Sequence, residues 1–309
     1  MSGLFLSYSE YIRERYGCKG YRVSVDAGFS CPNRSGDRMS GGCSYCDSAG
    51  SRSPYILNET TLKEQISTSL KYLKYKYKAE VFFLYFQAYT NTFAPVDVLR
   101  RIYTAGLQEG PFRELIVSTR PDCLDREKID LLCEFQDRGY DIWLELGLQS
   151  AHNETLERIN RGHTAEDFFH TVSMIRQVGL KWTVHLIFGL PGEDRKDILD
   201  TVKQVAELSP DGIKIHNLHI PERSAMFKEY LLGELSFPGP ERHIQYLADA
   251  LELLPEKTVI MRISTDTPPG RSGCYPGYFP DKNRLYELLN EELKKRGTKQ
   301  GCRCPHGTI

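Results

Sequence analysis

Short runs of β-branched and aromatic residues alternate with amphipathic stretches along most of this chain, and this alternation constrains its fold more than any other feature. Such alternation is typical of repeated β-α units, in which parallel strands pair side by side and helices cover them. Apolar residues at intervals of three and four predict helices over residues 62–77 and 198–208. The predicted strands are residues 21–25, 81–86, 114–118, 142–148, 182–188, 212–216 and, as a candidate seventh, 258–263.

The spacing of these units predicts an α/β fold, an incomplete parallel (β/α)6 TIM-like barrel with a C-terminal cap. After a cysteine-rich loop there is room for about five further β-α units, whereas a full eight-unit barrel needs about 250 residues. A proline- and glycine-rich stretch begins near residue 265, and a final helix is expected over residues 281–296. We therefore expect a single domain, with the barrel in residues 1–264 and a closing segment, helix and tail in residues 265–309.

Overall charge and hydropathy exclude several classes of protein. The 40 basic and 41 acidic residues give a formal net charge of -1, so any nucleic-acid contact would have to be a local patch. No apolar run approaches the roughly 20 residues that a membrane-spanning helix needs, and we expect no membrane partner. Nine irregularly spaced cysteines and the lack of an apolar leader at the N-terminus indicate a reducing, cytoplasmic compartment.

Three cysteines, Cys31, Cys43 and Cys46, lie on one glycine-rich loop after the first predicted strand, with no fourth cysteine or histidine at local spacing. Structural zinc sites and ordinary iron–sulfur clusters take four protein ligands. Either one coordination position is open to a molecule other than the protein, or a distant cysteine or histidine completes a zinc site. Loops at the carboxyl ends of the strands build the active site of a β-α barrel, which places this loop on the functional rim.

Five separate motifs follow one another along the chain. They are Gly28-Phe-Ser-Cys-Pro-Asn-Arg-Ser-Gly36 with Gly41-Gly-Cys-Ser-Tyr-Cys46, Tyr85-Phe-Gln-Ala-Tyr-Thr-Asn-Thr92, Glu145-Leu-Gly-Leu-Gln-Ser150, Arg161-Gly-His163 and Leu186-Ile-Phe-Gly-Leu-Pro-Gly192. These motifs resemble the radical S-adenosylmethionine (SAM) enzymes, and within them the Elp3/coproporphyrinogen-dehydrogenase-like branch. Eleven residues separate Cys31 from Cys43, a long first gap that is similar to that of the Elp3-like branch. The order of the motifs agrees with an uncharacterised-type subgroup of the branch.

The resemblance implies that Cys31, Cys43 and Cys46 bind three irons of a [4Fe-4S] cluster while SAM chelates the fourth iron. It implies an enzyme, an oxidoreductase or transferase of unassigned reaction, that cleaves SAM reductively to a 5'-deoxyadenosyl radical. The electron would come from a reduced donor such as flavodoxin or ferredoxin. By motif position, the resemblance assigns SAM contacts to Gln87, Thr90, Gln149 and Arg161, and to Ser118 and His185, which stand where the branch often has acidic residues.

Alternative interpretations of single residues stay open at this level. His185 lies in an apolar strand pattern, so it either contacts SAM or forms a hydrogen bond inside the core. His216 and His219 either line the mouth of a substrate site or are buried structural histidines. The C-terminal segment Cys302-Arg-Cys304-Pro-His306 fits no established metal motif, and we expect a free tail there.

The substrate is constrained mainly by the resemblance. The Elp3-like branch includes tRNA-modifying enzymes, and the subgroup has been linked to modification of the wobble uridine, so tRNA is the leading expected substrate and partner. On a helix, Lys71, Lys74, Tyr75 and Lys78 share one face that either contacts RNA or is simply solvated. The alternatives are a radical SAM enzyme acting on a small molecule and a non-catalytic zinc or iron–sulfur binding module.

Overall fold

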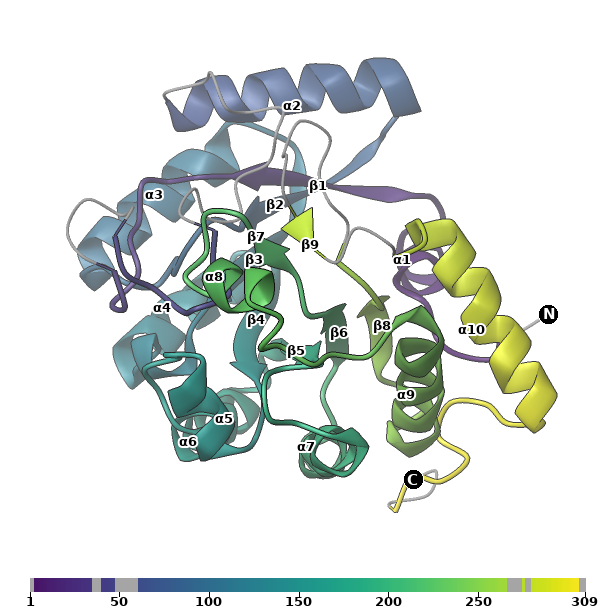
Figure 1. Cartoon of the computed structure of the whole chain (residues 1–309). Helices are drawn as coiled ribbons and strands as arrows, with labels where there is room; N and C mark the ends of the chain where they lie inside the picture. The colour runs from purple at the N-terminus through teal and green to yellow at the C-terminus, as the bar shows by residue number, and fades with distance from the viewer. Residues whose placement is uncertain (1–2, 35–39, 48–60, 266–273, 276–278, 306–309) are drawn as a thin grey trace.

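A single parallel sheet of seven strands curves into a half-barrel, with helices on its outer side (Figure 1). The computed structural model describes residues 3–34, 40–47, 61–265, 274–275 and 279–305. The strands pair in the order β1-β2-β3-β4-β5-β6-β8, and every pair is parallel. The predicted incomplete barrel is confirmed, and it includes the candidate seventh strand.

All seven predicted strands are present, each within two residues of its expected ends. Strand ends are set by where the apolar alternation stops, which the sequence displays directly. The strands are β1 (Gly20–Val25), β2 (Val81–Phe86), β3 (Phe112–Thr119), β4 (Asp141–Gln149), β5 (Lys181–Phe188), β6 (Gly212–Asn217) and β8 (Val259–Arg262).

Helices connect these strands and cover the outer face of the sheet. Asp125 and Asp194 cap two of the helices by accepting hydrogen bonds from backbone N–H groups of the first turn. The helices that follow successive strands are α2 (Leu62–Tyr77), α3 (Val96–Gln108), α4 (Arg126–Asp137), α6 (Ala165–Val178), α7 (Arg195–Glu207) and α9 (Pro240–Leu253). Shorter elements near the rim are η2 (Pro121–Cys123), α5 (Asn153–Arg158), α8 (Phe227–Leu231) and the two-stranded ribbon of β7 (Ile220–Pro221) and β9 (Cys274–Tyr275).

Over most of each strand, side chains alternate between the two faces of the sheet, because successive residues of a strand point to opposite sides. On β4, Leu144 and Leu146 point outward into the main core against the helices. Trp143 belongs to a separate apolar cluster inside the barrel, together with Phe83 and Ile116. Unlike the outer layer, the interior also carries charged side chains near the middle of the strands.

Helix α1 (Tyr8–Tyr16) closes the amino-terminal end of the barrel and is not among the predicted elements. Its buried Ile12 packs into the interior apolar cluster, and the ring of Tyr11 meets Trp143 edge-on with centroids 5.8 Å apart. Just before the helix, Ser7 forms an isolated parallel bridge with Ile260 of β8. Helix α1 therefore covers this end of the barrel interior.

The C-terminal segment packs against the barrel instead of forming the expected free tail. Helix α10 (Lys282–Arg296) lies beside α9, as Figure 1 shows. Buried Gln300 then donates its backbone N–H to the carbonyl of Leu4 and accepts from the N–H of Leu6, both at 2.9 Å. Within the segment expected to be free, Arg303 donates its backbone N–H to the carbonyl of Glu252 at 2.8 Å, so the expectation is wrong there. His306 lies outside the described residues.

Across the described ranges, no helix has both the length and the apolar character required to span a bilayer.

Glu114 is a buried carboxyl group at the closed end of the barrel. One of its oxygens accepts a hydrogen bond from the Tyr16 hydroxyl at 2.8 Å, and the other has no hydrogen-bond partner within the described part of the chain. Burial raises the pKa of Glu114 from 4.5 to about 7, although Tyr16 and Arg22 oppose the change. The folded protein therefore binds a proton at Glu114 more tightly than the unfolded chain does.

We predict that Glu114→Gln becomes increasingly stabilising as the pH rises from 5 to 8. Because the folded-state pKa of Glu114 is raised, its protonation contributes roughly 3 kcal/mol to the free energy of unfolding below about pH 4.5, and this contribution is lost by about pH 7. The amide of the variant stays neutral at every pH, so the variant does not lose this stability. Urea unfolding of both proteins at pH 5 and pH 8 measures the difference, with the exposed Glu207→Gln as control. A stability difference that does not change with pH would contradict the prediction.

Candidate functional site

The loop that carries Cys31, Cys43 and Cys46 begins at the carboxyl end of β1 and is fixed to distant segments by its backbone. The N–H of Ser44 donates to the carbonyl of Ile159 at 2.9 Å, and the carbonyl of Ser44 accepts from the N–H of Met226 at 2.9 Å. These two bonds hold the cysteine loop between the segment after α5 and the start of α8. The thiols of Cys43 and Cys46 consequently lie over the barrel rim, as the strand-end rule predicts.

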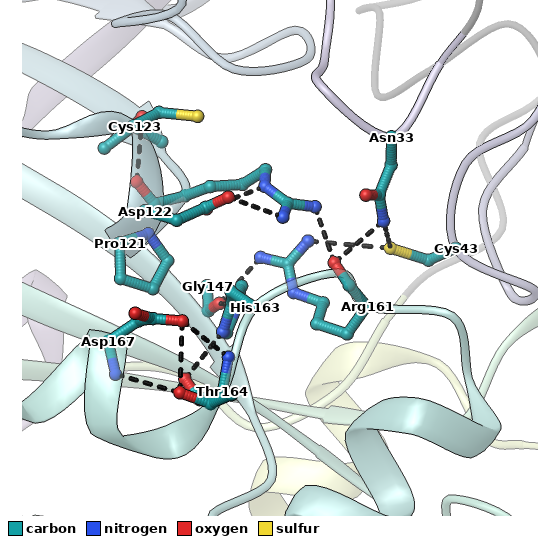
Figure 2. Close-up of polar contacts among 12 residues, drawn as sticks. Asn33, Cys43, Pro121, Asp122, Cys123, Gly147, Arg161, His163, Thr164 and Asp167 are labelled. Atoms are coloured by element: carbon teal, nitrogen blue, oxygen red, sulfur yellow. Dashed lines mark hydrogen bonds and ion pairs between the residues drawn. The ribbon is translucent and has the colours of Figure 1, made fainter.

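Arg161 and Asn33 point toward the sulfur of Cys43, as Figure 2 shows. Arg161 donates through Nη1 to Cys43 Sγ at 3.6 Å and through Nη2 to the carbonyl of Gly147 at 2.6 Å. Asn33 Nδ2 lies 3.8 Å from the same sulfur and donates to the carbonyls of Asn160 and Arg161 at 2.7 and 2.8 Å. The loop after α5 is thus joined to the cysteine loop through side chains as well as backbone.

Two further guanidinium groups surround the thiols. Arg34 donates through Nη2 to Cys46 Sγ at 3.1 Å and to the carbonyl of Asp47 at 2.7 Å. Arg120, directly after β3, is buried, forms an ion pair with Asp122 at 2.8 Å and donates to the carbonyl of Arg161 at 2.6 Å. A cationic environment of this kind favours thiolate, the form that binds metal.

The two deeper thiols respond differently to this environment. For Cys43, burial opposes ionisation, but the nearby Arg161 and Arg120 outweigh it and lower the thiol pKa below its ordinary value. For Cys46, burial and the neighbouring Cys43 raise the thiol pKa, although Arg34 acts in the opposite direction. Each of these two thiols therefore has its own guanidinium in contact, Arg161 at Cys43 and Arg34 at Cys46.

The structure brings Gln149 and Arg161 together above Gly147. A Cβ atom at Gly147 would lie 2.6 Å from both Arg161 Nη2 and Gln149 Nε2, so only glycine leaves room for the two side chains. Gln149 itself has φ 78°, a left-handed conformation at the irregularity where β4 leaves its register with β5. Strain at the end of a strand is often associated with a functional site, and here it directs Gln149 to the rim.

The other predicted site residues fall into two groups. Thr90 is buried, with its N–H donating to the carbonyl of Ser30 at 3.2 Å, and Gln87 follows directly after β2. The carbonyl of Ser118 accepts from Asn91. These three lie at the ends of strands, close to the cysteine loop. His185 lies lower, inside the barrel, where its Nε2 is 3.2 Å from a carboxylate oxygen of Glu145.

Asn33, Arg34 and Arg120 were not predicted as site residues. Asn33 and Arg34 lie within two or three positions of Cys31, and Arg120 directly follows a strand, so each position is one where the strand-end rule could have flagged a side chain. Arg34 contacts Cys46 and Asp47 within its own loop. Asn33 and Arg120, in contrast, reach the loop after α5, which lies 128 positions from Asn33 and 41 from Arg120. No local sequence pattern indicates these two long-range contacts.

A cavity of about 500 Å³ opens beside Cys43 and Cys46, a volume within the range of about 300–1,000 Å³ that is typical of small-molecule sites. Its lining residues are Gly41, Gly42, Cys43, Cys46, Asn160, Glu222, Arg223, Ser224 and Ala225. Close by, the buried Nε of Arg161 has no hydrogen-bond partner in the described part of the protein. A free donor, a glycine-lined space and the thiols of Cys43 and Cys46 suit an anionic metal–sulfur group bound with a small polar molecule.

Within the ranges that the structure describes, no three His, Cys, Asp or Glu side chains are grouped tightly enough to hold a single metal ion.

Comparisons with known proteins agree with the motifs. The family model described as Radical SAM superfamily matches residues 34–205, and the model described as Radical_SAM C-terminal domain matches residues 210–295. An uncharacterized Bacillus subtilis protein, YtqA, is 38% identical over 94% of this chain and 90% of its own length. A tRNA uridine(34) acetyltransferase of Methanocaldococcus jannaschii is 29% identical over 62% of this chain and 34% of its own length.

Among solved structures, an archaeal Methanocaldococcus infernus Elp3 with an N-terminal deletion superposes with a TM-score of 0.71. The match has 20% sequence identity, covers 91% of this chain and spans 64% of the length of that Elp3 chain. At this level of identity the likeness establishes a shared fold. It agrees with the half-barrel.

We predict that Gly162→Ala loosens the contact between the cysteine loop and the loop after α5. Gly162 has φ +74°, and a Cβ there would lie 2.1 Å from Asn33 Oδ1, so alanine must displace Asn33. Gly179→Ala is the matched control, because Gly179 has φ +71° with nothing within 4 Å of a Cβ.

Both variants carry the cost of a left-handed alanine, about 1–2 kcal/mol. Only Gly162→Ala adds the steric cost and should also retain less iron after anaerobic reconstitution. Urea unfolding and iron per chain are the measurements. Equal stability and equal iron content in the two variants would show that the Asn33 contact is unimportant.

Proposed function

The chain belongs to the radical SAM superfamily, and from this premise we propose that Cys31, Cys43 and Cys46 hold three irons of a [4Fe-4S] cluster whose fourth iron binds SAM. When bound, these cofactors supply an electron and a 5'-deoxyadenosyl radical. The observation that carries the proposal is the pair of rim thiols, Cys43 and Cys46, which accept hydrogen bonds from Arg161 and Arg34 beside a cavity of about 500 Å³.

The roles of the surrounding residues follow from their contacts. Arg34 and Arg161 donate to cysteine sulfurs, and hydrogen bonds to sulfur together with positive charge make a cluster easier to reduce. We propose that Gln87, Thr90 and Ser118 bind SAM from one side of the rim. Gln149 and Arg161, which meet over Gly147, bind it from the other side. The contact of His185 with Glu145 favours a position below the cofactor, facing the substrate.

The radical SAM proposal is tested by anaerobic reconstitution with iron and sulfide. We expect a brown protein with about four irons per chain that forms 5'-deoxyadenosine from SAM and dithionite. Cys43→Ser should lose both properties, whereas Cys18→Ser, in the turn between α1 and β1, should keep them. A colourless wild-type protein that holds one zinc and leaves SAM intact would instead identify a non-catalytic zinc module.

For the substrate, we propose the wobble uridine of a tRNA, with a small molecule as the alternative. Support comes from the tRNA uridine(34) acetyltransferase that shares 29% identity over 62% of this chain. The end of helix α2 adds support, because it exposes lysines and an aromatic ring together. Tyr75 is 83% exposed, the ammonium of Lys78 lies 5.9 Å from the centre of its ring, and Lys71 and Lys74 are exposed nearby. Exposed rings that stack on bases and cations that contact phosphates are the usual means of binding RNA.

The lysine–tyrosine face lies at the far end of α2 from the rim, because the helix runs back antiparallel to β1 and Tyr77 stacks on Tyr21 near the start of that strand. At 1.5 Å per residue, its distance from the helix start is on the order of 20 Å. This face would therefore hold the body of a large RNA, while the reacting nucleotide lies at the rim.

The tRNA proposal predicts a change in modified nucleosides. A strain lacking the gene should lose or accumulate a wobble-uridine derivative, detected by mass spectrometry of digested tRNA. Wild-type protein should restore the profile, and the Cys43→Ser variant should not, because the chemistry depends on the cluster. An unchanged nucleoside profile in the deletion strain would favour the small-molecule alternative while leaving the radical SAM proposal intact.

We also propose that residues 265–309 close the barrel of residues 1–264 as part of one domain. The hydrogen bonds that Gln300 forms with Leu4 and Leu6 support this, because they join the last and first segments of the chain. The contact of α10 with α9 extends the same surface.

A further inference from the structure

Glu145 is a fully buried carboxylate at the middle of β4, and side chains from four other strands converge on it. Arg22 of β1 donates to Oε1 at 2.8 Å, and His185 of β5 lies 3.2 Å from Oε2. The hydroxyl of Tyr85 on β2 and the ammonium of Lys214 on β6 also bond to Oε2. These residues form a polar layer across the barrel, between the apolar cluster above α1 and the cofactor rim.

A fourth basic side chain joins this layer through an irregularity in the last strand. Ile213 pairs with Ile260, but the next residue, Lys214, pairs with Arg262, so Met261 is the extra residue of a β-bulge. A bulge redirects the side chains that follow it. Arg262 thereby becomes the direct neighbour of Lys214, and within the described ranges no hydrogen bond or ion pair engages its guanidinium.

Positive charge exceeds negative charge in this layer. Arg22 and Arg262 are permanently charged, and Glu145 is the single carboxylate that contacts the layer in the described part of the chain. Burial and the two arginines lower the pKa of Lys214, while Glu145 raises it. The net charge of the layer is therefore positive whether or not Lys214 carries a proton. Glu114 lies one level lower, toward α1, and burial favours its neutral form.

The layer is accessible from the cofactor side. The side chains of Arg22 and His185 keep 19% and 17% of their surface exposed although both point into the barrel. Helix α1 seals the opposite end, so this exposed surface faces the space beneath the rim or the open side. The ring of His216 lies 5.7 Å from that of His185, and its Nδ1 contacts Thr265 Oγ1 at 2.6 Å. Both histidines therefore line the space above Lys214 and Arg262.

We propose that this layer is an anion site, in which Lys214 and Arg262 bind a carboxylate or phosphate group of the substrate while Arg22 stays paired with Glu145. The proposal rests on the proposed function, because it places substrate in the barrel directly beneath SAM. Adjacent basic side chains on neighbouring strands can share one tetrahedral or planar anion, and His185 or His216 can donate a further hydrogen bond. A purely structural network would leave Arg262 without a role.

The test uses the anaerobically reconstituted protein with saturating SAM, so that anions cannot occupy the arginines at the rim. Calorimetric titrations at constant ionic strength with inorganic phosphate and, separately, with malonate distinguish the two kinds of anion. We expect saturable binding of one of them. Arg262→Gln should weaken that binding at least tenfold, and Arg176→Gln, an exposed arginine of α6, should leave it unchanged.

A second variant keeps the proposal falsifiable if Arg262→Gln folds poorly. Glu145→Gln removes the single carboxylate of the layer and should tighten binding of the same anion severalfold, the opposite direction from general damage. Absence of saturable binding to the wild-type protein by either anion, or equal affinity of the wild type and Arg262→Gln, would overturn the anion site.

Formation of 5'-deoxyadenosine in the same preparation separates the two proposals. A preparation that cleaves SAM but binds neither anion contradicts only the anion site. One that binds the anion but leaves SAM intact contradicts only the radical SAM function.

Discussion

Uniform strand direction is the constraint on which the rest of this structure depends. All seven strands of the sheet run parallel, so every strand ends at the same rim, and the loop that follows each strand has to cross it. The cysteine loop after β1, Gln87 after β2, Arg120 after β3 and Gln149 at the end of β4 meet there for that reason. An antiparallel sheet of the same sequences would divide these residues between two ends.

Because the strands are pleated, alternate side chains point outward to the helices or inward to the barrel interior. Outward residues such as Leu144 form a continuous apolar core with the helices, and this core provides most of the hydrophobic stabilisation. Inward residues meet across a narrow space closed at one end by α1. Buried charges are tolerated there because Glu145 receives donors from several strands at once, and an ion pair held by additional hydrogen bonds offsets its desolvation better than an isolated pair.

Much of the fold was predictable from local patterns. The alternation of apolar and polar positions located seven strands, and Asp125 and Asp194 marked two helix starts. Helix α1 was missed because its apolar face is short and its partners, Phe83 and Trp143, are distant in sequence. The tail was misjudged for a related reason: Gln300 is fixed by Leu4 and Leu6, at the opposite end of the chain.

By itself, the sequence determined the chemical class of this protein: three cysteines without a fourth local ligand, on a loop that follows a strand, within a set of motifs in a fixed order. Tertiary structure decided what surrounds them. Asn33 and Arg161 reach the same sulfur across 128 positions, and Arg22 reaches Glu145 across 123. The period of two along a strand predicts which residues point inward, but the register and the curvature of the sheet decide which of them are in contact. The charge balance inside the barrel could therefore be read only from the folded chain.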